Sequence, residues 1–237
     1  EEVDYPHPVL ENILKETFGL YIYQEQIMNI SRELCGFTPG EADNLRKAMG
    51  KKKIDVLNKM KERFVNGAWE LNKFDPEKCE KMWDSILAFA SYCFNKSHSA
   101  CYGLIAYWTA YLKANYFPEF MTANLIYEMG NKEKMTMFTR ELQSRDIDVL
   151  PPDINESGWE FTWTGKAVRF GFGGIKGVGQ GAAEHLIELR KEDGNYDSLY
   201  NICERINTRV CNKRVIDNMI KVGALDSIHL NRNALET

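Results

Sequence analysis

The apolar residues between positions 101 and 112 recur every three or four positions, and this spacing predicts an α-helix with one apolar face. They are Cys101, Leu104, Ile105, Trp108 and Leu112. We expect this helix to run from Ser99 to Phe117, with its apolar face buried against other helices. Ser97 or Ser99 is expected to cap its N-terminus through a side-chain oxygen.

The residues that lead into this helix have the chemistry of an anion site. They read Phe94-Asn95-Lys96-Ser97-His98-Ser99. The first turn of a helix has unpaired N–H groups and the positive end of the helix dipole, which attract phosphate or carboxylate. Lys96 and His98 add donors there, and the rings of Phe94 and Tyr102 either stack on a base or pack in the core. The alternative is a capped core helix with a solvated lysine and an ordinary histidine.

The same periodicity predicts a mainly α fold up to residue 145. Helices are expected at residues 9–18, 24–35, 39–50, 55–72, 76–93, 118–129 and 132–145. Gly36 is a C-cap candidate, while Thr38, Pro39 and Glu41 have the pattern of an N-cap, a first-turn proline and a capping-box acid.

The pattern changes after residue 145. Residues 159–163 and 168–172 alternate on either side of a turn, which predicts a β-hairpin. Gly177 and Gly179 then form a turn that opens a helix at residues 182–190, and a second helix at residues 214–222 breaks at Gly223. These two turns resemble paired helix-hairpin-helix elements, which hold the backbone of duplex DNA without reading its bases. The alternative for the two glycines is a tight strand-to-helix turn.

These changes divide the chain into three expected parts. They are a helical core at residues 1–145, a β-hairpin connection at 146–175 and a tandem helix-hairpin-helix at 176–237. The composition, 44% hydrophobic and 27% charged, is that of a globular protein.

The charge is uneven along the chain. The net charge of −4 argues against a wholly basic coat for nucleic acid, yet residues 44–63 carry a local charge of +6 and residues 205–221 one of +4. Lys51, Lys52 and Lys53 form a cluster suited to a polyanion, through point charges that carry no sequence information. The alternative is that each basic segment is an ordinary solvated face.

Other features argue against zinc, metal and membrane chemistry. None of the six cysteines forms a C-x-x-C pair, so we expect reduced core thiols and no zinc site. Asp146 and Asp148 lack a third carboxylate, so they predict a turn and not a metal site. The chain has neither a membrane-length apolar run nor a signal peptide. The reduced thiols favour a cytoplasmic protein. Because the chain does not begin with Met, we expect it to be part of a longer chain.

Several long motifs occur together in one known family, in this order and at similar spacing. They lie at residues 9–26, 45–52, 94–99, 150–155 and 174–179. Nearly end to end, the chain resembles part of the alpha subunit of bacterial DNA polymerase III, a C-family replicative polymerase, of the DnaE type more than the PolC type. Cys93 and Cys101 are small departures, where the family more often has Gly and Ala.

The resemblance implies a fingers region that leads into a helix-hairpin-helix segment. Such a region binds the incoming dNTP and the primer–template DNA for template-directed nucleotidyl transfer. The expected nucleotide-binding residues are Arg46, Lys47, Asn95, Lys96, Ser97, His98 and Tyr102. The expected DNA-binding residues are Lys51, Lys52, Lys53, Lys176, Gly177, Gly179, Lys213 and Arg214.

The resemblance also implies what this segment lacks. In the family, the carboxylates that hold Mg²⁺ lie in the palm, upstream of this region, so we expect no catalytic or metal-binding residue here. DNA-directed DNA polymerase activity then belongs to the full-length chain, and the segment alone is expected to be inactive. The sliding clamp and other replicase subunits are expected partners of the full-length chain, with no membrane involved.

Two other functions remain open from the residues. The first is a stand-alone helix-hairpin-helix module without a nucleotide site, in which replacement of Lys96 or His98 spares duplex binding. The second is a helical protein-interaction adaptor whose basic segments are merely solvated, which predicts no salt-sensitive DNA binding.

Overall fold

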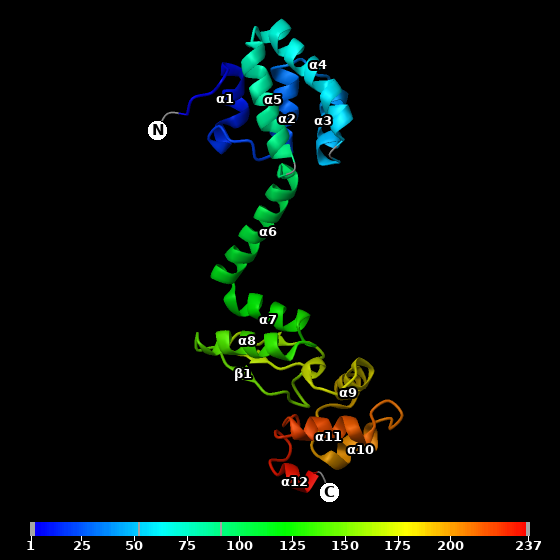
Figure 1. The fold of residues 1–237 in the computed structure, drawn as a ribbon. Helices are drawn as coiled ribbons and strands as arrows, with labels where there is room; N and C mark the ends of the chain where they lie inside the picture. Colours follow the sequence, from blue (N-terminus) through cyan, green and yellow to red (C-terminus); the bar gives the residue numbers. More distant parts are fainter. Residues whose placement is uncertain (1–2, 52, 91, 236–237) are drawn as a thin grey trace. The chain divides into compact units, whose positions relative to one another are not determined.

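The computed structural model describes residues 3–51, 53–90 and 92–235, and this part of the chain is mainly helical with a small sheet (Figure 1). It divides into two compact units, Glu1–Tyr107 and Trp108–Thr237. Helix α6 (Lys96–Asn115) begins in the first unit and ends in the second.

The first unit is built from helices that follow the predicted periodicity. They are α1 (Pro8–Leu14), the 3₁₀ helix η1 (Lys15–Thr17), α2 (Gln24–Glu33), α3 (Pro39–Gly50), α4 (Ile54–Asn72) and α5 (Pro76–Ala90). The predicted capping box at α3 is confirmed: Thr38 Oγ1 accepts from the backbone N–H of Glu41, and the Glu41 carboxylate accepts from that of Thr38. Gly36 has the positive φ of +68° expected of a helix C-cap.

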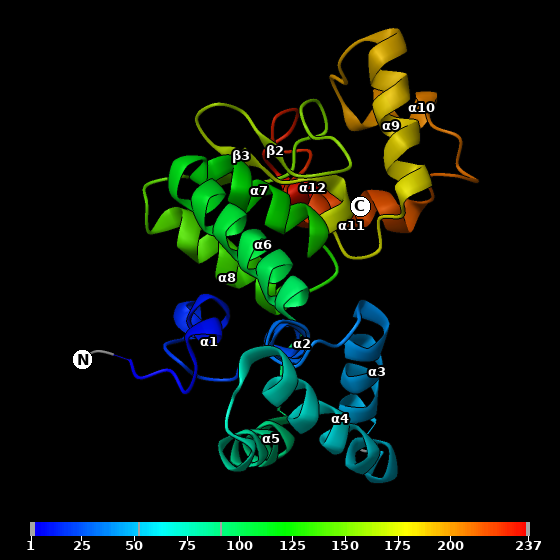
Figure 2. The same ribbon diagram turned by 90° about the horizontal axis from the view of Figure 1, so that it is seen from above.

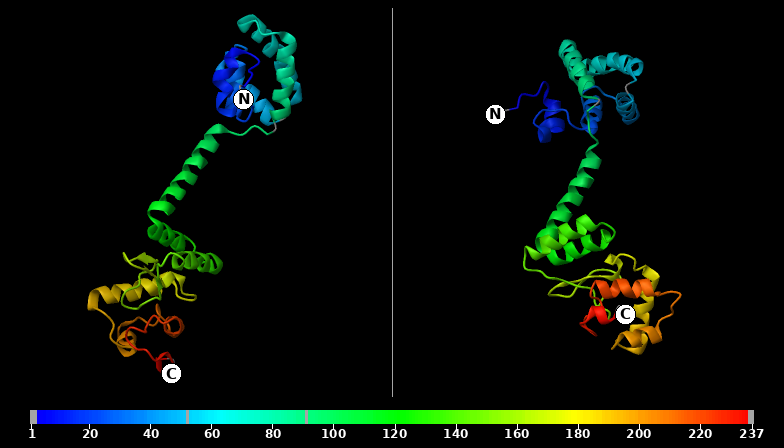
Figure 3. Two further views of the ribbon diagram at one scale, coloured as in Figure 1. Left: turned by 90° about the vertical axis from the view of Figure 1, so that its left-hand side faces the viewer. Right: turned by 60° about the horizontal axis from the view of Figure 1, so that its bottom comes forward.

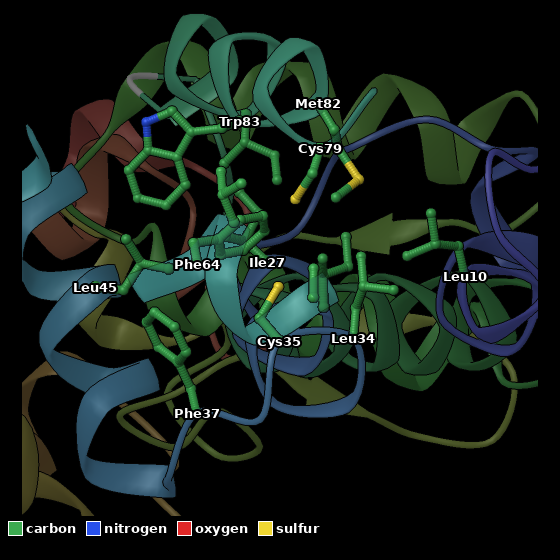
Figure 4. Close-up of a cluster of buried hydrophobic side chains, with 14 of the residues drawn as sticks. Leu10, Ile27, Leu34, Cys35, Phe37, Leu45, Phe64, Cys79, Met82 and Trp83 are labelled. Atoms are coloured by element: carbon green, nitrogen blue, oxygen red, sulfur yellow. The ribbon is translucent and has the colours of Figure 1, made fainter. Parts of the chain in front are cut away.

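One apolar core holds these helices together. Helix α2 packs against α1 and α3, α3 packs against α4, and α4 packs against α5. Phe64 and Trp83 are fully buried in this core, with ring centroids 5.0 Å apart (Figure 4). Phe89 on α5 lies outside this core, because 46% of it is exposed.

Helix α4 also completes the C-terminal end of α2. The Arg63 guanidinium donates to the carbonyls of Cys35 and Gly36, at 3.2 and 3.0 Å, and the Asn72 amide donates to the Leu34 carbonyl at 2.7 Å. These bonds satisfy carbonyls that a helix end leaves without partners. Gly67 permits the close approach, since a Cβ atom there would lie 2.1 Å from the Cys35 carbonyl oxygen.

Gly67→Ala is therefore expected to destabilise the first unit by about 1–3 kcal/mol, because the added methyl group meets backbone. In an open helix position the same change stabilises by up to about 1 kcal/mol. Gly40→Ala is the matched control, since nothing lies within 4 Å of a Cβ atom at that position. Urea unfolding followed by circular dichroism measures both variants, and equal midpoints would contradict the close packing at Gly67.

The second unit begins with two helices packed on a small sheet (Figure 2). Its first elements are α7 (Phe117–Tyr127), α8 (Lys132–Gln143), β1 (Val149–Leu150), β2 (Thr162–Trp163), β3 (Val168–Arg169) and the 3₁₀ helix η2 (Phe172–Gly174). Strands β2 and β3 are antiparallel, which confirms the predicted hairpin. Strand β1 pairs in parallel with the other edge of β3, in the order β1-β3-β2.

The remaining helices of this unit, drawn as ribbons in Figure 3, contribute to a separate apolar core. They are α9 (Gln180–Asp193), α10 (Leu199–Arg205), α11 (Lys213–Lys221) and α12 (Arg232–Leu235). Turns at Gly177 and Gly223, with φ near +85°, precede α9 and follow α11, as expected for the two glycine turns. After Gly223 the chain continues in turns, although a helix is expected to restart near Asp226, and α12 begins only at Arg232.

The predicted buried face of α6 is also wrong. Helix α6 lies wholly within the described residues and has no buried residue; Leu104 and Trp108 are 47% and 54% exposed. The apolar clusters of the two units contain no residue of α6 among the described residues. None of the described helices combines the length and apolar character that a bilayer crossing requires.

The cysteines match the expectation of core thiols only in part. All six are free; Cys35, Cys79 and Cys211 are buried and Cys93 is half-buried. Burial raises the pKa of the Cys211 thiol to about 11, so that thiol stays protonated at neutral pH. Cys101 and Cys203 are exposed, so the expectation is wrong for these two.

Candidate nucleotide and DNA contact sites

The start of α6 is fixed to the start of α2 by backbone pairing. Phe94 N donates to the Ile22 carbonyl at 2.9 Å, and Gln24 N donates to the Phe94 carbonyl at 3.0 Å. This bridge brings two segments about 70 residues apart in sequence side by side. It sets the position of the anion-site motif relative to α2.

The rings of Phe94, His98 and Tyr102 form a series along the first turns of α6. The ring centroids of Phe94 and His98 are 5.3 Å apart, and those of His98 and Tyr102 are 4.4 Å apart. Phe94 and Tyr102 are 48% and 61% exposed, and His98 is exposed. The series is therefore a surface platform, which excludes the interpretation of these rings as core packing.

Carboxylates already occupy the predicted anion site. The backbone N–H of Lys96 donates to the Glu25 carboxylate at 2.9 Å, and the Lys96 ammonium pairs with Glu16 at 2.5 Å. The hydrogen bond with Glu16 raises the pKa of Lys96 above its ordinary value. The helix start thus attracts anions, as its dipole and free N–H groups require. Glu16 and Glu25 were not predicted as site residues, because 80 and 71 positions separate them from Lys96.

The cap of α6 differs from the prediction. Asn95 Oδ1 accepts from the backbone N–H of His98 at 2.8 Å, so Asn95 is the capping residue. Ser97 lies inside the first turn with an exposed side chain, and Ser99 follows it. The predicted serine cap is wrong because the helix begins at Lys96, which places the cap one residue before it.

Arg46 and Lys47 lie on α3 and share one acid. Arg46 contacts Asp43 Oδ1 through two nitrogen atoms, at 3.0 and 2.8 Å, and Lys47 Nζ lies 2.7 Å from Asp43 Oδ2. Lys47 and then Arg46 hold the pKa of Asp43 below its usual value. Arg46 also lines a small hollow with Gln24 and Cys93, next to the motif. The spacing of Asp43 from the two cations, three and four residues on one helix, signals this pairing in the sequence.

The predicted lysine cluster lies at the turn between α3 and α4. Lys51 directly follows α3 as its C-cap and Lys53 directly precedes α4, and both side chains are exposed. Lys52 lies outside the described residues.

The glycine turn before α9 lines a cleft of about 260 Å³ with α11. Lys176 and Gly177 lie on one side, and Arg214, Asn218 and Lys221 lie on the other. Glycine is required at position 177 for two reasons. Its φ is +86°, and a Cβ atom there would lie 2.5 Å from the Asn218 amide nitrogen. Gly179 has open space around it, so another molecule has access to this part of the turn.

The structure separates two neighbouring cations of α11. Arg214 lines the cleft with Lys176, whereas Lys213 lines a different cleft with Cys203 and Asp217. Lys221 belongs to the basic C-terminal segment but was not predicted as a site residue. Its position seven residues after Arg214, on the same face of a helix, is the signal that identifies it.

No metal centre emerges from the described part of the chain. Residues 3–51, 53–90 and 92–235 bring together no group of three His, Cys, Asp or Glu side chains that fits a metal ion.

Two family models match the chain. The bacterial DNA polymerase III alpha subunit finger domain matches residues 1–72, and the helix-hairpin-helix motif matches residues 146–235. The two matches cover the first four helices and the glycine-turn cleft.

Curated relatives match almost the whole chain. DNA polymerase III subunit alpha of Aquifex aeolicus is 45% identical over 99% of the chain, and that of Saccharopolyspora erythraea is 45% identical over 95%. The subunit of Mycobacterium tuberculosis is 43% identical over 97%. The chain spans 19–20% of the length of these relatives. It therefore belongs to the bacterial DNA polymerase III alpha subunit family, of which it comprises the finger-domain and helix-hairpin-helix segments.

Proposed function

We propose that this chain is the fingers portion of a replicative DNA polymerase, which binds the incoming dNTP and primer–template DNA during template-directed nucleotidyl transfer. The observation that carries this proposal is the match to DNA polymerase III alpha subunits along nearly the whole chain, from the first helices to the helix-hairpin-helix. Polymerase activity belongs to the full-length protein, and this segment alone is proposed to be inactive in primer extension.

The nucleotide contact works by exchange of anions. Arg46, Lys47 and Lys96 are each paired with an exposed or half-exposed carboxylate, from Asp43 or Glu16. A triphosphate carries more negative charge than these single carboxylates and takes their place on the cations. Asn95, Ser97 and His98 complete the helix start, and Tyr102 offers a ring to the base or sugar. The fixed charges then stabilise the charge that develops on the phosphates.

The DNA contact is a hold on the backbone. Lys176 and Arg214 both line the glycine-turn cleft, and the open space at Gly179 gives a phosphate access to the backbone. Lys213 lies on the neighbouring face of α11, and the exposed Lys51 and Lys53 add contacts to the template or duplex backbone from the first unit.

The wider role follows from the family. The functional boundaries are proposed at residues 1–145, 146–175 and 176–237. Mg²⁺ is held by the palm of the full-length protein, and the sliding clamp and other replicase subunits are its partners in the cytoplasm. A stand-alone helix-hairpin-helix module remains the second candidate, because the glycine-turn cleft is complete without the first unit.

Lys96→Ala is expected to weaken dNTP binding about ten- to hundredfold, because a charge-assisted contact to phosphate is lost. The assay is titration of a fluorescent dNTP into the 237-residue chain with bound primer–template. Lys113→Ala is the matched control: Lys113 also lies on α6 and also pairs with a glutamate, Glu141, at 2.7 Å. Glu16→Gln is expected to strengthen dNTP binding, because it removes the competing carboxylate. Equal effects of the two lysine variants, with duplex binding retained, would favour the stand-alone module.

A further inference from the structure

The second unit contains another cleft, of about 930 Å³, between α8 and the segment from β3 to the glycine turn. Its apolar side chains include Met129, Met135 and Phe170. Its volume is within the range of ligand clefts, about 300–1,000 Å³. Of the site residues predicted from the sequence, only Lys176 and Gly177 line this cleft.

Every charged side chain that lines this cleft is a cation. They are Lys132, Arg140 and Lys176, and all three are exposed. Of the acidic side chains on or beside α8, Glu128 pairs with Lys134 and Glu141 pairs with Lys113, and Glu133 does not line the cleft. The cleft therefore has a net positive field that favours an anionic occupant.

Two glycines give the cleft its apolar lining. A Cβ atom at Gly174 would lie 2.5 Å from the Phe170 ring, and one at Gly173 would lie 3.0 Å from the Met129 sulfur. Larger residues at these positions would displace Phe170 and Met129 from the places they now hold. The result is a surface with flat and flexible apolar groups between cations, which suits a flat, apolar ring attached to an anion.

The cleft adjoins the glycine-turn cleft, because Ile175, Lys176 and Gly177 line both. We propose that it binds an unpaired stretch of a nucleic-acid strand, with bases on the apolar lining and phosphates on Lys132, Arg140 and Lys176. A duplex presents only phosphates and base edges, whereas unpaired bases expose the ring faces that stack on such a surface. The inference rests on the proposed function, because the strand reaches this cleft past the shared Lys176.

The test is fluorescence anisotropy of the 237-residue chain with labelled single-stranded oligo-dT across a salt series. Lys132→Gln combined with Arg140→Gln is expected to weaken binding about tenfold and to lower the salt slope by about 1.4, at about 0.7 for each single-strand phosphate contact. An abasic strand of equal length and charge is expected to bind wild type about tenfold more weakly than oligo-dT, through loss of stacking. Lys166→Gln combined with Lys191→Gln removes equal charge outside both clefts and is the matched control.

Duplex binding separates this inference from the proposed function. The Lys132 and Arg140 variant is expected to bind duplex DNA like wild type, because neither residue lines the glycine-turn cleft. Duplex binding without single-strand binding would overturn the inference alone, whereas the absence of both would overturn the DNA contact as well. Equal affinity for abasic and oligo-dT strands would also overturn it. The inference would also be overturned if the Lys132 and Arg140 variant lost affinity for a polyglutamate peptide but kept its affinity for oligo-dT, because the cleft would then be a peptide site.

Discussion

Phe64→Ala is expected to lower the free energy of unfolding of the first unit by about 3–5 kcal/mol. Phe64 is fully buried on α4, its ring lies 5.0 Å from that of Trp83 on α5, and it meets Phe37 edge-on at 6.1 Å. Truncation leaves a cavity where three aromatic rings now pack and also removes their mutual attraction. Because the same core includes residues of α2 and α3, the loss reaches the helices that carry Arg46 and the bridge to Phe94.

Phe89→Ala is the matched control for this change. Phe89 is on the neighbouring α5 and is 46% exposed, so its truncation is expected to cost no more than about 0.5 kcal/mol. Urea unfolding followed by circular dichroism compares the two variants. Similar midpoints for both would contradict the assignment of Phe64 to the centre of the core.

Lys176→Gln combined with Arg214→Gln is expected to weaken binding of duplex DNA about fiftyfold at ~0.1 M salt. The two side chains both line the glycine-turn cleft, and both are exposed. Each phosphate contact contributes about 0.9 to the slope of log affinity against log salt, so the slope is expected to fall by about 1.8. Anisotropy of a labelled duplex across a salt series measures both quantities.

The control for this variant removes two charges elsewhere in the same unit. Lys166→Gln combined with Lys191→Gln is expected to leave the slope nearly unchanged, because neither residue lines the cleft. If both double variants lowered the slope equally, the whole basic surface would attract DNA, and the glycine turn would have no specific role in DNA binding.

Local signals in the sequence predicted much of the fold. The capping box from Thr38 to Glu41, the C-cap at Gly36 and the hairpin of β2 and β3 each depend on residues within a few positions of one another. Spacing and turn chemistry specify such features directly. The parallel pairing of β1 with β3 was not predicted, because nothing local links strands almost 20 residues apart.

The candidate sites were predicted less completely, for two physical reasons. Contacts of Lys96 with Glu16 and Glu25 arise only when η1 and α2 meet the start of α6, so the motif alone does not reveal its carboxylate partners. Lys213 and Arg214 are adjacent in sequence, but neighbouring helical residues point about 100° apart, and they line different clefts. The exposed face of α6 has the periodicity of a buried one, and periodicity does not reveal what a helix packs against.

The central claim is that one chain carries a nucleotide contact at the start of α6 and a DNA contact at the glycine turn. Amide NMR of the ¹⁵N-labelled 237-residue chain tests it most directly, by titration first with primer–template and then with a dNTP. The account predicts that DNA shifts the amides of Gly177 and Gly179, and that the dNTP then shifts those of Ser97, His98 and Tyr102. Shifts at the glycine turn alone, with the start of α6 unmoved at saturating dNTP, would contradict it.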